Sequence, residues 1–170
     1  MNLERYDSNQ ITEYSYRFVS IGPKGKFKMH VHFSYIGGSI YNLGFGVVDL
    51  EAGELNDLIE TRNGDSERIL ATVASIALEF MARHPTASVY ASGSTPSRTR
   101  LYQMGINRIL SNLKQYEIAG LVLERDLNGN PPENYYNWKG TWQKIERGIA
   151  YDGFLLFDPS MTKLDNLFNN

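Results

Sequence analysis

Residues 63–110 read NGDSERILATVASIALEFMARHPTASVYASGSTPSRTRLYQMGINRIL, and this stretch decides the fold. It holds two helix patterns on either side of a short apolar strand. The first begins near Asp65, whose side chain can accept a hydrogen bond from a free first-turn amide, and it ends before Pro85. Apolar side chains recur every three or four residues from Ile69 to Met81. Such spacing is typical of a helix packed against a core.

The second helix pattern starts in a loop suited to binding an anion. Thr95 is a natural N-cap and Pro96 fits the first helical position. Backbone amides and the positive end of the helix dipole converge at such a strand–turn–helix junction, so phosphate, sulfate or carboxylate groups bind there. Arg98 could add a bidentate clamp. The predicted ligand residues are Gly93, Ser94, Thr95, Ser97, Arg98 and Arg100.

A plain capped helix start, with its arginines in water, is the alternative for this loop. The loop is not a P-loop, because no Gly-Lys-Ser/Thr ending is present. We expect the helix to run from Pro96 to about Tyr116. Its expected buried stripe comprises Tyr102, Ile106, Ile109 and Leu113.

The other segments predict a largely antiparallel sheet. Alternating β-favouring residues between turn signals indicate an N-terminal meander of three strands, over residues 14–21, 27–36 and 40–50. Two later strands are expected over residues 118–124 and 153–157. The predicted fold class is therefore α+β, with this sheet packed against the two main amphipathic helices.

Length and composition predict a single domain over residues 1–170, because 170 residues with 42% apolar content suit one sizeable core. Residues 160–170 are expected to form a frayed tail. The formal net charge of -2 argues against non-specific nucleic-acid binding, although a local basic patch stays open. Cysteine is absent. With no signal peptide and no apolar run long enough to cross a bilayer, we expect a cytoplasmic protein without a membrane partner.

Three further features carry weaker signals. His30 and His32 share one face of a strand, but no third ligand is close in sequence, so a solvent-facing role is favoured and no metal site is predicted. Residues 51–61 are expected to form a surface loop or a short irregular helix. The aromatic cluster from Tyr135 to Trp142 either packs against the sheet, which we favour, or closes a pocket.

Several motifs resemble those of an uncharacterised bacterial domain family found mainly in Bacteroidota. They are Tyr41-Asn42-Leu43-Gly44-Phe45-Gly46, the Asn63-Gly64-Asp65 turn before Leu70-Ala71-Thr72-Val73-Ala74, and the run from Gly93 to Tyr102. The resemblance covers most of the chain. It implies a shared fold and carries no established activity.

The order of strands and helices also resembles that of the acetyl-CoA-dependent N-acetyltransferase superfamily. In this resemblance Arg62, Asn63, Gly64, Asp65 and Ser66 would form the loop near the CoA pyrophosphate, and Tyr102 would act as the general acid. The superfamily's Arg/Gln-x-x-Gly-x-Gly/Ala loop is missing, and Gly105 lies one residue closer to Tyr102 than usual. A core position for Tyr102 is the favoured alternative.

Two functional hypotheses follow. The favoured one is a small non-catalytic binding or regulatory protein, without a cofactor. It would recognise an anionic group on a partner protein, nucleic acid or small ligand through residues Gly93 to Arg100. The alternative is a divergent acetyl-CoA-dependent acyltransferase with a toxin- or defence-associated role. Residue types alone do not identify the ligand.

Overall fold

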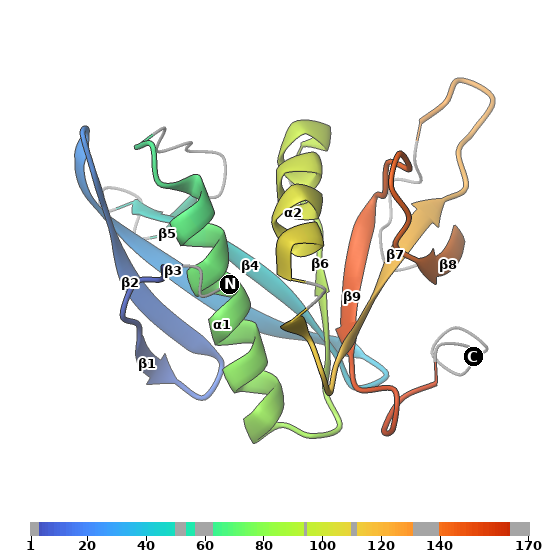
Figure 1. Cartoon of the computed structure of the whole chain (residues 1–170), viewed down its shortest axis with the longest axis horizontal. Helices are drawn as coiled ribbons and strands as arrows, with labels where there is room; N and C mark the ends of the chain where they lie inside the picture. Colours follow the sequence, from blue (N-terminus) through green and yellow to red (C-terminus); the bar gives the residue numbers. More distant parts are fainter. Residues whose placement is uncertain are drawn as a thin grey trace. The chain divides into compact units, whose positions relative to one another are not determined.

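The computed structural model describes residues 4–49, 54–56, 63–93, 95–109, 112–130 and 140–163. They form β-strands and two α-helices (Figure 1). Internal contacts divide the chain into two compact units: unit 1 contains residues 1–35 and 42–84, and unit 2 contains residues 36–41 and 85–170. The expected α+β class, with largely antiparallel strands and two main helices, is confirmed. That residues 1–170 form one domain remains a prediction.

Unit 1 is built on an antiparallel sheet that extends the predicted meander. The strand order is β1-β2-β3-β4, and β5 pairs with β4. The strands are β1 (Asn9–Thr12), β2 (Ser15–Gly22), β3 (Gly25–Gly37), β4 (Ile40–Asp49) and β5 (Glu54–Asn56), of which residues 36–41 belong to unit 2.

Two of these strands differ from the sequence prediction. Strand β1 was not expected, and its polar residues carry no apolar alternation to reveal it. Strand β5 lies within residues 51–61, so the expected loop or irregular helix is wrong for this part. Main-chain pairing with the end of β4, where Val48 lies opposite Leu55, makes it a strand. The neighbouring residues 50–53 and 57–62 lie outside the described part of the chain.

Helix α1 (Ser66–Arg83) packs on one face of this sheet (Figure 1). The predicted apolar stripe is confirmed, because Ile69, Val73, Ile76 and Phe80 are all buried. The ring of Phe80 stacks on Phe33 of β3 with centroids 4.0 Å apart. The helix ends where the His84 amide donates to the Phe80 carbonyl, directly before Pro85.

The β2–β3 pair has one buried and one open face. On β3, Met29, Val31 and Phe33 are buried as predicted, whereas Tyr35 at the far end is 64% exposed. On β2, Tyr16 and Phe18 are buried on the same side. Arg17 and Val19 point away from them and are exposed.

Unit 2 contains the remaining elements. They are β6 (Ser88–Ala91), α2 (Pro96–Ile109), β7 (Glu117–Leu123), β8 (Gly140–Lys144) and β9 (Gly153–Phe157). The strands are ordered β6-β9-β7-β8, and each neighbouring pair is antiparallel. The core between them includes Ile40, Tyr90, Ala119, Leu121, Leu123, Leu155 and Phe157.

Strand β8 was missed by the sequence analysis and carries part of the aromatic cluster. Trp142 packs against this core and meets Tyr90 edge-on, with ring centroids 6.2 Å apart. The favoured interpretation, aromatic packing on the sheet, therefore agrees with the position of Trp142. Tyr135, Tyr136 and Trp138 lie outside the described residues.

Helix α2 is shorter and less buried than predicted. It ends at Ile109 and not near Tyr116, and Thr99 is its buried residue. Tyr102, Ile106 and the following Leu113 are half-buried against a small cluster of Ile118, Tyr151 and Phe154. One side of α2 thus rests on the sheet, while Leu101 and Met104 stay 41% and 51% exposed. None of the described helices has the length and apolar character needed to span a bilayer.

Candidate functional site

Two threonines form hydrogen bonds at the start of α2. The Arg98 amide donates to Thr95 Oγ1 at 3.2 Å, so Thr95 is the N-cap that the sequence predicts. The Thr99 amide donates to the Thr95 carbonyl at 3.0 Å. Pro96 has no amide hydrogen. The Ser97 amide is therefore the first-turn donor that takes no part in these two hydrogen bonds.

Gly93 is required because the helix start lies against it. A Cβ atom at this position would sit 2.4 Å from the Thr99 amide nitrogen, far inside contact distance. The Gly93 amide donates to Thr99 Oγ1 at 3.0 Å, and Thr99 Oγ1 lies 3.1 Å from the Thr95 carbonyl, to which it donates. Gly93 therefore positions α2 and lines the groove, while its amide is bonded to Thr99.

A groove of about 770 Å³ opens beside this helix start, within unit 2. Thr95, Ser97 and Arg100 line it from α2, and all three are exposed. Apolar surface comes from Pro96, Met104 and Ile149. The groove is therefore mixed in character, with a polar end at the helix start and apolar patches along its length.

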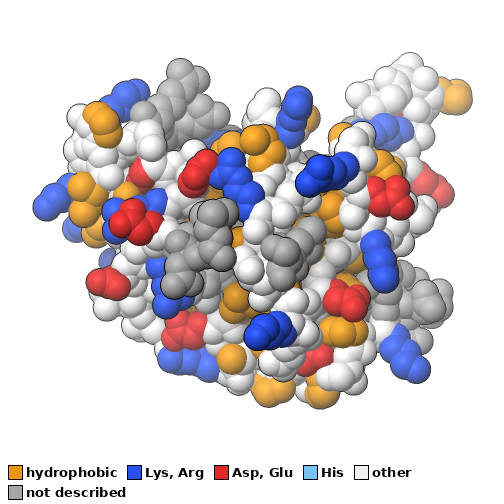
Figure 2. Space-filling view, viewed as in Figure 1, with side chains coloured by type: hydrophobic (Ala, Val, Ile, Leu, Met, Phe, Trp, Pro, Cys, Tyr) orange, Lys and Arg blue, Asp and Glu red, His pale blue; other side chains and the backbone are white. Residues whose placement is uncertain are grey.

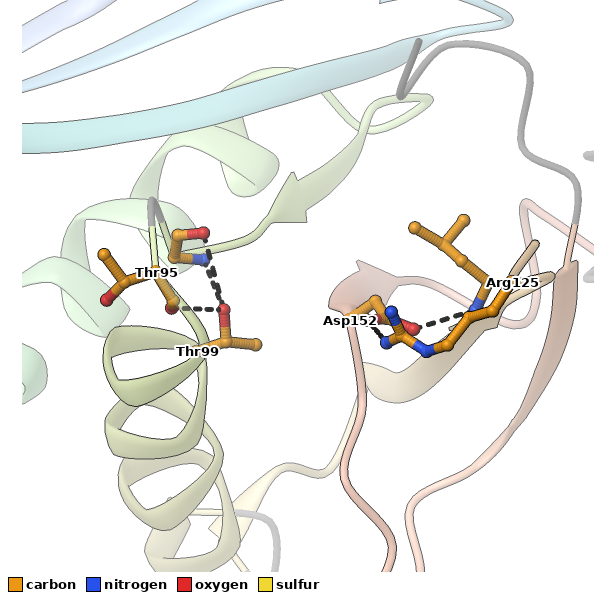
Figure 3. A network of polar contacts seen from close by, with 6 residues as sticks. Thr95, Thr99, Arg125 and Asp152 are labelled. Carbon is orange, nitrogen blue, oxygen red and sulfur yellow. Dashed lines mark hydrogen bonds and ion pairs between the residues drawn. The ribbon is translucent and has the colours of Figure 1, made fainter. Parts of the chain in front are cut away.

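The opposite wall is formed by the end of β7 and the loop before β9 (Figure 3). Asp152 accepts from the Leu123 amide at 2.9 Å and forms an ion pair with Arg125. Its own amide donates to the Leu121 carbonyl at 2.7 Å. These bonds hold the Asp152 carboxylate in place and fix Arg125 at the rim of the groove.

Gln103 links the two walls, and Tyr151 holds the loop that forms one of them. Gln103 Nε2 of α2 donates to the Ile149 carbonyl of the loop at 2.8 Å. The Tyr151 hydroxyl accepts from the Glu146 amide at 2.8 Å and lies 3.2 Å from the Lys144 carbonyl. Its ring fills the space above Gly120, where a Cβ atom would come within 2.4 Å of it. The groove is thus preformed by the fold.

The ionisable side chains among the described lining residues are Arg100, Arg125, Asp152 and Tyr151. Asp152 is paired with Arg125, and the Tyr151 hydroxyl is bonded to backbone, so neither is placed as a general base. Arg100 leaves the described lining with an excess of positive charge next to the positive end of α2.

The other predicted loop has a different role. Asn63 is 2% exposed, and its side chain bonds backbone on the β2–β3 turn, accepting from the Lys24 amide at 2.7 Å and donating to the Gly25 carbonyl at 2.9 Å. Gly22 allows this approach, because a Cβ atom there would lie 2.2 Å from the Asn63 carbonyl oxygen. Arg62 and Ser94 lie outside the described residues.

Asp65 occupies the N-cap position of α1 without capping it. The expected side-chain bond to a helix amide is absent for this residue. Its carboxylate instead accepts from the Tyr6 hydroxyl at 2.6 Å and from Ser20. Burial, followed by the hydrogen bond to Asp65, raises the pKa of Tyr6. The hydrogen bonds of Asn63 and Asp65 thus stabilise unit 1. Gly64 and Ser66 are exposed.

The remaining candidates fall outside the groove. Tyr102 packs against the Ile118–Tyr151–Phe154 cluster and is not among the lining residues. The rings of His30 and His32 lie 6.2 Å apart. Among the described residues, no group of three or more His, Asp or Glu side chains could hold a metal ion.

The groove residues beyond α2 were missed by the sequence analysis. They are Leu123, Arg125, Gly148, Ile149, Ala150, Tyr151 and Asp152. A usable signal existed, because antiparallel neighbours place the end of one strand beside the start of the other. Pairing the predicted strands 118–124 and 153–157 would have brought Arg125 and Asp152 together.

Comparison with known proteins gives the family and no activity. A family of unknown function, DUF6934, matches residues 2–158, so the chain belongs to this family. No curated protein and no solved structure matches the chain. The membership agrees with the resemblance to an uncharacterised domain family. The bacterial source, the individual motifs and the acetyltransferase likeness stay predictions.

Proposed function

We propose that this protein is a small non-catalytic binding or regulatory protein whose groove beside the start of α2 takes an anionic group of a ligand or partner. The observation that carries the proposal is the preformed groove itself, which is lined by Arg100 and Arg125 and by no acid–base pair among its described residues. An arginine at a helix start recognises carboxylate or phosphate strongly. The apolar surface of Pro96, Met104 and Ile149 would contact the uncharged part of the ligand.

Arg100 is the main anion contact in this proposal. Arg100 is exposed and lies on the groove side of α2. Arg125, by contrast, is already ion-paired with Asp152. Ser97 and Thr95 add hydroxyl groups at the same end of the groove. Arg98 is half-buried and does not line the groove, so it is removed from the set of direct ligand contacts that we propose.

The test is a set of binding titrations at matched ionic strength with inorganic phosphate, pyrophosphate and acetyl-CoA as probes. Ligand binding raises the melting temperature through linkage, and calorimetry gives the affinity. Loss of one hydrogen-bonded charge costs about 1.5–3 kcal/mol, so Arg100→Ala should weaken binding about tenfold or more.

Arg108→Ala is the matched control, because Arg108 lies on the same helix but does not line the groove. It should leave the affinity unchanged. Equal weakening by both variants, or no binding of any probe, would contradict the proposal. Binding of acetyl-CoA that survives Arg100→Ala and is lost when the loop of residues 63–66 is altered, for example by Ser66→Ala, would instead support the acyltransferase alternative.

A further inference from the structure

Unit 1 has an unusual surface on the side of the sheet opposite α1. We call it the open face, and it consists of Arg17, Val19, Ile21, Lys26, Lys28, His30 and His32. The register places Arg17 opposite His30, Val19 opposite Lys28 and Ile21 opposite Lys26, so these side chains lie side by side. All are exposed except His30, which is half-buried.

The charged side chains of the described open face are all basic. No Asp or Glu occurs between Ser15 and Val48, although the whole chain has a formal net charge of -2. Lys24, in the turn that joins β2 to β3, adds another exposed cation at one end. The positive charge is therefore a local feature of this face and not a reflection of overall composition.

The α1 side of the same unit has a different charge pattern. Basic and acidic side chains are interspersed around α1 (Figure 2), and Arg83 pairs with Glu79 one turn away. A protein that needed charge only for solubility would show the same mixture on both sides. The segregation of cations on the open face indicates a polyanionic partner.

We propose that the open face binds single-stranded nucleic acid through its phosphate backbone. Alternate residues of a strand are about 6.7 Å apart. Lys26 and Lys28 are thus spaced like successive phosphates in an extended single strand, and His30 and His32 continue the same row. The two lysines and the neighbouring Arg17 would follow the backbone without reading base edges.

The uncharged parts of the open face suit bases and sugars. The imidazoles of His30 and His32 are stacked at 6.2 Å and present flat rings on which unpaired bases can stack. Val19 and Ile21 are 39% and 52% exposed between the cations. These two aliphatic side chains are too few for the broad apolar face by which proteins enter an anionic bilayer.

His30 lies next to other basic side chains on the open face. Burial first, and then the charges of Arg17 and His32, lower the pKa of His30. Strand β4 offers no compensating carboxylate between Ile40 and Val48. A phosphate bound at the neighbouring Arg17 would favour the protonated form of His30.

The test is fluorescence anisotropy with labelled oligothymidine and oligouridine at neutral pH. If Arg17, Lys26 and Lys28 each neutralise one phosphate, raising the salt from about 50 to about 200 mM should weaken binding about 18-fold. In the double variant Lys26→Gln/Lys28→Gln, the same change in salt should weaken binding only about threefold. Circular dichroism should show an unchanged fold, because both side chains are exposed.

The control is Lys114→Gln/Lys144→Gln, which removes the same charge from exposed positions in unit 2. It should keep the wild-type affinity and salt dependence. Three results would overturn the inference: no binding at low salt, an equal loss in the control, or tighter binding to phosphatidylserine vesicles or polyglutamate than to the oligonucleotides. The open face and the groove share no residue and belong to different units, so Arg100→Ala should leave oligonucleotide binding intact.

Discussion

The starts of α1 and α2 both follow a glycine-containing turn with polar side chains, yet those side chains are used differently. At α1, Asn63 is buried and bonds the β2–β3 turn, and Asp65 accepts from Tyr6 and Ser20. At α2, Thr95 caps the helix while remaining exposed at the edge of a groove. The polar side chains at the start of α1 stabilise unit 1, whereas those at the start of α2 border a groove.

We propose that this difference decides which of the two helix N-termini takes a ligand. Free amides and the dipole are common to every helix. At α1, Tyr6 and Ser20 hold the Asp65 carboxylate at the N-cap position, where its negative charge would repel an anion. At α2 the threonine bonds are local, and the groove side remains open to solvent.

The largest expected effect is a difference in the free energy of unfolding between variants at the two helix starts. Asn63→Ala should lower the free energy of unfolding by about 3 kcal/mol, because it leaves the Lys24 amide and the Gly25 carbonyl without their partner. Ser97→Ala, at an exposed position of the α2 start, should change it by less than about 0.5 kcal/mol. Urea unfolding measures both. Similar losses in the two variants would remove the distinction.

A smaller effect is expected inside the α2 start. Thr99→Val keeps the side-chain shape but removes the hydroxyl that bonds the Gly93 amide and the Thr95 carbonyl. We expect a loss of about 1–2 kcal/mol in the free energy of unfolding. Thr141→Val, at an exposed position of β8, should be nearly neutral. No loss in Thr99→Val would mean that this hydroxyl does not hold the helix start.

The smallest expected effect is a loss of stability at alkaline pH, and it involves the α1 start alone. Because the pKa of Tyr6 is raised above 10.0 in the folded protein, the unfolded chain loses this proton first as the pH rises. The Tyr6 contribution to stability is therefore complete below pH 10 and falls as the pH rises through the folded pKa. Between about pH 9 and 11, wild-type protein should lose more stability than Tyr6→Phe.

Tyr35→Phe makes the same chemical change at an exposed position and should retain the wild-type loss. Parallel stability curves for wild type and Tyr6→Phe across this range would contradict the assignment. Arg100→Ala should affect neither curve, because this side chain lies at the α2 start.

Sequence reasoning worked where a single element carries its own pattern. The buried stripe of α1, the alternation of β3 and the Thr95–Pro96 helix start were all predicted correctly. Strands β1 and β8 were missed because their residues show no strong alternation. The end of α2 at Ile109 was also missed, since apolar spacing continues past it.

The site was only half predictable for a physical reason. The α2 wall is one continuous segment, whereas Arg125 and Asp152 meet through strand pairing 27 residues apart in sequence. The true role of Asn63 depends on backbone partners 39 and 38 residues away. Local sequence shows that a side chain can cap or bind, but tertiary contacts decide what it meets.

The most direct test is a nuclear magnetic resonance titration of the ¹⁵N-labelled protein with pyrophosphate at constant ionic strength. Our account predicts shifts of the backbone amides of Ser97, Arg100, Gln103 and Gly148, with no change at Gly64, Asp65 or Ser66. Shifts centred on residues 63–66, or spread evenly over the described residues, would contradict the claim that the α2 start alone opens on a ligand site.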